Sequence, residues 1–142
     1  MYFKNENSEI EIIVNGYTEL PEKYDEEIGK NALSCTILYS LSRDWGEGVM
    51  FEELFQTSEI ILLHDKIIDL LAKKLDTIEY RDEWNYFTFV AQRIKNEFEV
   101  YVNIINRAGS EDINGTFKMT FDELKGIEEE LQEYMIKFPI VD

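Results

Sequence analysis

The sequence predicts a single α+β domain, in which a curved, mainly antiparallel β-sheet carries two amphipathic helices. Three observations lead to this prediction. Several segments alternate apolar and polar residues, as strands with one buried face do. Two longer segments repeat apolar residues at helical spacing. Hydrophobic residues make up 44% of the 142 residues, which is enough for one sizeable core, so we expect residues 1–142 to form one domain.

Three strands are expected in the first half of the chain. The segment Glu9–Tyr17 reads as the first, with a turn at the pair Asn15-Gly16. The segment ALSCTILYSL, residues 32–41, alternates clearly and reads as the second strand. Its expected inward residues are Leu33, Cys35, Ile37, Tyr39 and Leu41. The segment VMFEELFQ, residues 49–56, reads as the third.

The first helix is expected from Glu59 to about Asp76. Thr57 or Ser58 is a suitable cap, because a side-chain oxygen can accept a hydrogen bond from a free amide of the first turn. The apolar stripe is wide, so this helix should be well buried against a sheet. It comprises Ile60, Leu63, Ile67, Leu70, Leu71 and Leu75.

The second half of the chain returns to strands and ends in a helix. Strands are expected at residues 84–91, 97–105 and 113–121. Asp122 is the expected cap of the second helix, Lys137 lies in its last turn, and Pro139 ends it. The segment GIEEELQEYMIK of this helix contains three consecutive glutamates, residues 128–130. We expect them on the flank and the outer surface of the helix.

The two halves correspond at a spacing of 64 residues. Ile60 matches Leu124, and Leu63 matches Ile127 in position and type. Any unit of strand, cap and helix would produce part of this likeness, so it does not amount to a sequence repeat. It does indicate a possible structural pseudo-repeat of the form β-β-β-α, typical of an α+β fold.

The charge of the chain is strongly negative. Thirty acidic residues against 14 basic ones give a net charge of −16. Such a charge repels nucleic acid phosphate and anionic lipid, so we expect neither nucleic acid nor a membrane as a partner. It would speed the encounter with a basic partner.

Few residues suggest catalysis. His64 and Cys35 both lie among apolar neighbours and are expected in the core. The triplet formed by Asp122, Glu123 and Lys125 resembles the acid and lysine set of metal-dependent nucleases, but it opens a helix, where Asp122 serves better as a cap. We therefore expect no enzyme activity, no cofactor and no metal. A hydrolase that uses carboxylate-bound metal is a minor alternative.

The location of the protein is expected to be the cytoplasm. One cysteine excludes an internal disulfide, the first residues contain no apolar secretory segment, and no apolar run approaches the ~20 residues of a membrane span.

Candidate partner-binding residues lie in three acidic segments. The segment ELPEKYDEE, residues 19–27, has five carboxylates and one lysine, with Tyr24 as a possible anchor. Two tryptophans have acidic neighbours, as do the aromatic anchors of protein interfaces. The candidates are Glu19, Glu22, Tyr24, Asp25, Glu26, Glu27, Asp44, Trp45, Glu47, Asp82, Glu83 and Trp84.

The chain resembles the WapI-like bacterial immunity proteins over most of its length. The resemblance lies in NGY at residues 15–17, in Tyr24 and Asp25, in NAL at residues 31–33, and in the terminal segment ELKGIEEELQEYMIKFPIVD. It implies a small cytoplasmic α+β protein of contact-dependent or polymorphic toxin systems, which binds and neutralises a cognate, basic, nuclease-type toxin domain. The alternative is another acidic binding module, such as a phage-borne DNA mimic or an accessory subunit.

Overall fold

The computed structural model describes residues 1–17, 32–40, 47–82, 86–105 and 112–140, with the backbone alone for residues 47–53. It contains two four-stranded antiparallel sheets and two helices, which confirms the predicted α+β class. The elements are β1 (Tyr2–Lys4), β2 (Glu9–Tyr17), β3 (Ala32–Ser40), β4 (Glu47–Gln56), α2 (Thr57–Leu71), β5 (Thr77–Arg81), β6 (Phe87–Ile94), β7 (Glu97–Ile104), β8 (Ile113–Met119) and α3 (Phe121–Lys137).

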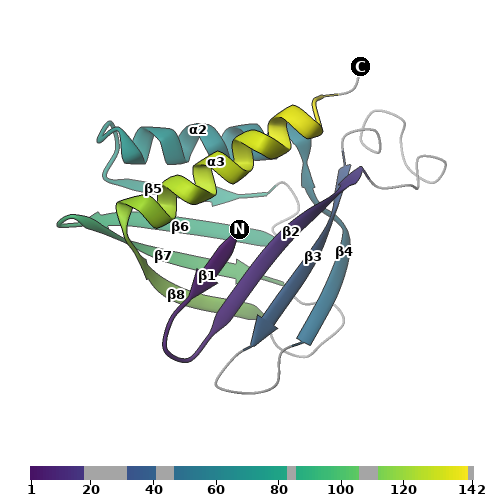
Figure 1. Ribbon diagram of the computed structural model, residues 1–142, viewed down its shortest axis with the longest axis horizontal. Helices are drawn as coiled ribbons and strands as arrows, with labels where there is room; N and C mark the ends of the chain where they lie inside the picture. Colours follow the sequence, from purple (N-terminus) through teal and green to yellow (C-terminus); the bar gives the residue numbers. More distant parts are fainter. Residues whose placement is uncertain (18–31, 41–46, 83–85, 106–111, 141–142) are drawn as a thin grey trace.

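Each half of the chain forms one sheet and one helix. Strands β1 to β4 form sheet A and strands β5 to β8 form sheet B, each with its strands adjacent in chain order. The two helices lie side by side along one side of the molecule and run in opposite directions (Figure 1). The predicted pseudo-repeat is therefore present in the structure, with four strands in each half and not three.

The two additional strands are β1 and β5. β1 has three residues, too few to show a pattern in the sequence. β5 follows α2, which ends at Leu71 and not near Asp76. Lys73 adopts a left-handed backbone with φ of 61°, and the guanidinium of Arg93 donates a hydrogen bond to the carbonyl oxygen of Leu70. This turn releases residues 77–81 to pair with β6.

The N-cap residue of each helix lies one or two residues before the expected cap. The observed N-cap residues are Gln56 and Thr120. The hydroxyl of Thr120 accepts a hydrogen bond from the amide of Glu123 at 3.2 Å, and the Glu123 carboxylate accepts one from the amide of Thr120 at 3.1 Å. This reciprocal capping box requires a glutamate three residues after the cap, and Glu59 takes the same part after Gln56. Thr57, Ser58 and Asp122 are therefore not the caps.

The core lies between the inner faces of the sheets and the buried sides of the helices. The strand expected at residues 97–105 corresponds to β7. The alternation of its residues predicts that Phe98, Val100, Val102 and Ile104 share one face, and all four are buried. Cys35 is also buried in β3, and burial raises the pKa of its thiol well above the ordinary value. A thiol in this state packs as a small apolar group.

Aromatic rings join the two sheets. The Phe3 ring of β1 lies 5.6 Å from the Phe117 ring of β8 and 6.2 Å from the Phe89 ring of β6, between centroids. The Phe55 ring of β4 lies 4.9 Å from the Phe87 ring in an edge-to-face arrangement. Such pairs add about 0.5–1.5 kcal/mol each beyond the burial of their area. The two halves thus share one core.

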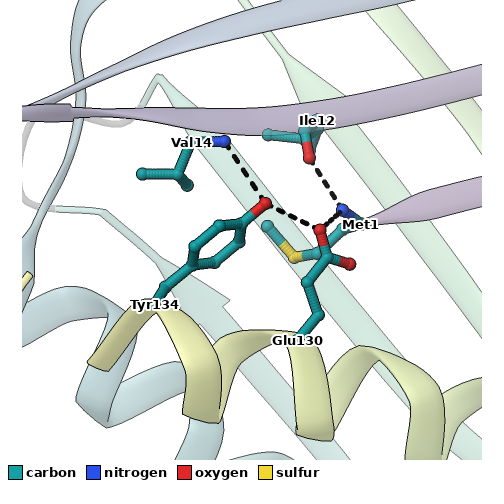
Figure 2. A network of polar contacts seen from close by, with 5 residues as sticks. All are labelled: Met1, Ile12, Val14, Glu130 and Tyr134. Atoms are coloured by element: carbon teal, nitrogen blue, oxygen red, sulfur yellow. Dashed lines mark hydrogen bonds and ion pairs between the residues drawn. The ribbon is translucent and has the colours of Figure 1, made fainter. Parts of the chain in front are cut away.

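The amino group of Met1 connects sheet A to α3 (Figure 2). Its ammonium donates hydrogen bonds to the carbonyl oxygen of Ile12 at 2.7 Å and to Oε1 of Glu130 at 2.6 Å. The Tyr134 hydroxyl donates to the same carboxylate oxygen at 2.7 Å and accepts a long hydrogen bond from the amide of Val14. The Met1 side chain is fully buried, so the ammonium requires these partners.

This network corrects the expected position of the glutamates at 128–130. Glu130 is half-buried against Met1, Glu128 is buried, and Glu129 alone is exposed to solvent. Local sequence does not reveal the difference, because the partner of Glu130 lies 129 residues away.

Replacement of Glu130 by glutamine should lower the free energy of unfolding by about 1–3 kcal/mol, because the buried ammonium loses its counter-charge. Urea unfolding followed by circular dichroism measures this change. Glu129→Gln is the matched control and should alter stability by less than about 0.5 kcal/mol. Equal effects of the two substitutions would show that the Met1 contact does not stabilise the fold.

Candidate functional site

Most of the predicted partner-binding residues lie outside the described residues. These are Glu19, Glu22, Tyr24, Asp25, Glu26, Glu27, Asp44, Trp45, Glu83 and Trp84. For Glu47 the structure describes the backbone alone, as the first residue of β4.

Asp82, one of the predicted partner contacts, is buried and not a surface residue. Its side chain is 3% exposed, and its Oδ1 accepts a hydrogen bond from the amide of Phe87 at 2.8 Å. The Asp82 amide also donates to the Phe87 carbonyl oxygen at 3.2 Å. Asp82 thus fixes the connection between β5 and β6. Sequence placed it beside Trp84 in an acidic segment but could not show that its carboxylate turns inward.

The buried polar cluster of the helices consists of His64, Glu128 and Lys125. Nε2 of His64 lies 3.1 Å from Oε1 of Glu128, and Nζ of Lys125 donates to Oε2 of Glu128 at 3.1 Å. His64 and Glu128 are separated by 64 residues and occupy equivalent positions in the two halves. Their contact marks the point where the antiparallel helices cross. The expected core position of His64 is confirmed.

The pKa of Glu128 is lowered from its ordinary value. Burial acts to raise it, but hydrogen bonds and charge interactions from Lys125 and His64 favour the carboxylate form and together prevail. The cluster therefore holds an ionised carboxylate between the helices. Both carboxylate oxygens of Glu128 have partners in the protein, whereas Nδ1 of His64 is buried without a hydrogen bond and lies 3.5 Å from Oδ1 of Asp65.

The lowered pKa of Glu128 predicts acid sensitivity. The folded state binds this proton more weakly than the unfolded state, whose glutamate pKa is about 4.3. The contribution to stability is therefore full above that value and is lost as the pH falls through the folded pKa. Unfolding free energies measured from pH 6 to pH 3 should fall less steeply for Glu128→Gln than for the unchanged protein. Glu129→Gln should keep the original slope, and a common slope for all three proteins would contradict this assignment.

No three His, Cys, Asp or Glu side chains within the described ranges lie close enough together to hold a metal ion. None of the helices described is both long enough and apolar enough to cross a membrane.

The outer faces of both sheets are nearly neutral. Sheet B presents many amides, hydroxyls and one tyrosine, with three acidic and two basic side chains. We call this set the sheet B face: Thr77, Glu79, Arg81, Thr88, Val90, Gln92, Ile94, Glu97, Glu99, Tyr101, Asn103, Asn114, Thr116 and Lys118. An open hollow of about 400 Å³ lies at the turn between β6 and β7, and Phe98 and Lys118 are among the residues that line it.

On sheet A the structure describes the side chains of β1, β2, β3 and the last three residues of β4, and the outer side of β1 to β3 has two acidic residues and one basic residue. We call this set the sheet A face: Tyr2, Lys4, Glu9, Glu11, Ile13, Asn15, Thr36, Leu38 and Ser40. Lys4 and Glu9 form an ion pair at 3.3 Å.

The solvent side of the helices is acidic. Five exposed carboxylates face one exposed lysine, Lys137. We call this set the helix face: Ser58, Leu62, Asp65, Ile68, Phe121, Asp122, Glu123, Gly126, Glu129, Gln132, Glu133, Ile136 and Lys137. Lys66 and Lys125 are half-buried and bonded to the carbonyl oxygen of Glu79 and to Glu128.

Sequence reasoning did not select the helix face as a site. The signal was present, because Asp122, Glu129 and Glu133 recur at seven- and four-residue spacing, which places them along one side of a helix. The same spacing is typical of any solvated helix surface. What distinguishes it here is the contrast with the nearly neutral sheet faces.

Comparison with known proteins identifies a shared fold but no family. No protein-family model matches the chain, and no curated protein matches its sequence. A solved structure of the plant transcriptional regulator PBF-2 is similar with a TM-score of 0.52 and 10% identity, over 97% of this chain and 82% of that one.

Two further structures are less similar. One is a guide-RNA-binding protein complex bound to a gRNA, with a TM-score of 0.45, 11% identity and 89% of each chain covered. The other is MRP1/MRP2 of Trypanosoma brucei, with a TM-score of 0.43, 11% identity, and coverage of 90% of this chain and 84% of that one.

These likenesses correct the expectation that nucleic acid is not a partner. The structure that is similar with a TM-score above 0.5 belongs to a transcriptional regulator, so the exclusion of nucleic acid was wrong. The exclusion was derived from the net charge of −16, which describes the whole chain. It does not describe the sheet faces, where acidic and basic side chains nearly balance.

Proposed function

We propose that this chain is a non-enzymatic, cytoplasmic immunity protein that binds a basic, nuclease-type toxin domain and neutralises it. The observation that supports this proposal is the uneven charge of its surface. Five exposed carboxylates gather on the helix face, whereas the sheet A face and the sheet B face each have only one more acidic than basic residue. One side of the described surface therefore has the sign that a basic partner requires.

A physical reason connects this surface to inhibition. A nuclease needs positive charge to hold phosphate, so an acidic protein surface can occupy the same site. Opposite charges also raise the association rate, by ~10-fold or more at low salt. Fast association matters for an inhibitor, because free toxin acts until it is bound.

The charge reversal Glu129→Lys with Glu133→Lys should slow association with the toxin domain at least ~10-fold and reduce the salt dependence. The measurement is stopped-flow fluorescence with the toxin domain encoded beside this chain. Glu9→Lys with Glu11→Lys on the sheet A face is the matched control, since it changes the net charge equally.

Three results are informative in this experiment. A larger effect of the helix pair supports docking at the helix face. Equal effects of both pairs would show that only net charge matters. Failure of the unchanged protein to bind or inhibit the toxin domain would rule out the immunity function itself.

A second candidate function is nucleic acid binding at the sheet B face. Two observations favour it: the chain shares its fold with a plant transcriptional regulator, and this face is nearly neutral and rich in amides. Tyr101, 39% exposed, stands opposite Val90 and Thr116 near the middle of the sheet. An exposed aromatic ring on an open sheet can stack against a base.

Replacement of Tyr101 by alanine should weaken binding of a labelled single-stranded oligonucleotide by about 1–3 kcal/mol if the second candidate is correct. Fluorescence anisotropy at low salt measures the dissociation constant. Tyr2→Ala on the sheet A face is the control, because Tyr2 is similarly exposed. Absence of binding by the unchanged protein at micromolar concentration would exclude this candidate.

A further inference from the structure

The solvent side of the two helices exposes four large apolar side chains. Leu62 and Ile68 of α2 are 48% and 38% exposed, and Asp65 lies between them in the sequence. Phe121 and Ile136 of α3 are exposed as well. Single exposed leucines are ordinary, but four large apolar side chains on one side of the molecule are typical of a contact surface.

The equivalent positions of α3 are not apolar. At the spacing of 64 residues, Leu62 corresponds to Gly126 and Ile68 to Gln132, whereas Asp65 corresponds to Glu129. The two helices pack along each other in opposite directions (Figure 1). The helix face therefore combines two exposed aliphatic side chains and Asp65 on α2 with an acidic ridge of Asp122, Glu129 and Glu133 on α3.

The acidic ridge has no partner of opposite charge in the described part of the chain. No ion pair there involves Asp122, Glu129 or Glu133. Two more apolar side chains lie on α3, Phe121 at its start and Ile136 near its end, the latter 74% exposed. The apolar groups thus lie among carboxylates that are available to an external cation.

We propose that the helix face binds a basic amphipathic segment of the partner protein, in which lysine or arginine side chains flank leucine-like side chains. This inference rests on the immunity function and specifies the partner surface that it requires. The aliphatic side chains of α2 bury the apolar groups of the segment, and Glu129 and Glu133 pair with its cations.

Charge complementarity favours this occupant over others. A second copy of the chain would bring the same five carboxylates to the interface, and like charges would oppose each other. Nucleic acid and anionic lipid carry the same sign as the ridge and would be repelled from it.

The probe for this inference is a synthetic 18-residue peptide of leucine and lysine, arranged at helical spacing so that it forms a basic amphipathic helix. A peptide of the same composition in scrambled order is its control. Amide chemical shifts of the labelled protein locate the binding site, and fluorescence anisotropy gives the dissociation constant at low and high salt.

The expected result is a set of shifts confined to α2 and α3, with at least tenfold weaker binding of the scrambled peptide. Leu62→Gln with Ile68→Gln should raise the dissociation constant at least tenfold. Leu38→Gln with Tyr2→Gln is the matched control on the sheet A face, where the two side chains are 44% and 49% exposed, and it should change binding less than twofold. Glutamine keeps the helix propensity of α2, and circular dichroism verifies the fold.

Several outcomes would overturn the inference. They are absence of binding, shifts centred on a sheet face, equal binding of the scrambled peptide, and equal losses from the two double variants. A dimer in sedimentation that Leu62→Gln with Ile68→Gln abolishes would assign the face to a second copy. Any of these results, together with intact toxin inhibition, would leave the immunity function standing and remove only this docking surface.

Discussion

The crossing of α2 and α3 is the constraint on which the arrangement of this protein depends. Among the described residues, these helices make the most extensive contact between the two halves of the chain. His64 and Glu128 meet at the crossing and are both buried, and Nε2 of His64 lies within hydrogen-bond distance of the Glu128 carboxylate. Because the same crossing holds both helices on one side of the molecule, it also brings their solvent sides into one surface.

The two halves of the chain share one arrangement of four strands and a helix, but they differ in the side chains that they place on it. The buried positions of the helices are similar, as Ile67 and Leu131 show, since both must fit a shared core. The exposed positions are free of that requirement and differ in part: Leu62 and Ile68 of α2 correspond to Gly126 and Gln132 of α3, whereas Asp65 and Glu129 are both acidic. The surface formed by both helices therefore contains apolar and acidic side chains.

The sequence was sufficient for the features that depend on local periodicity. The alternation in β7 identified its buried face, and the apolar stripes identified both helices with their buried sides. It was insufficient where a residue's role depends on a distant partner. Glu130 contacts Met1 and Glu128 contacts His64, contacts that no local pattern records. The carboxylate of Asp82 points inward because it accepts a hydrogen bond from the amide of Phe87. The net charge of the chain gave no indication that acidic and basic residues nearly balance on the sheet faces.

The contact between the first residue and the last helix has a consequence for biosynthesis. The ammonium of Met1 can pair with its carboxylate only after Glu130, which follows 129 residues later, has been made and has left the ribosome. Until then the amino end of sheet A lacks its attachment to α3. An acyl group retained on this nitrogen, or an affinity tag fused before it, would convert the cation into a neutral amide. Attachment of such tags at the other end of the chain avoids this loss.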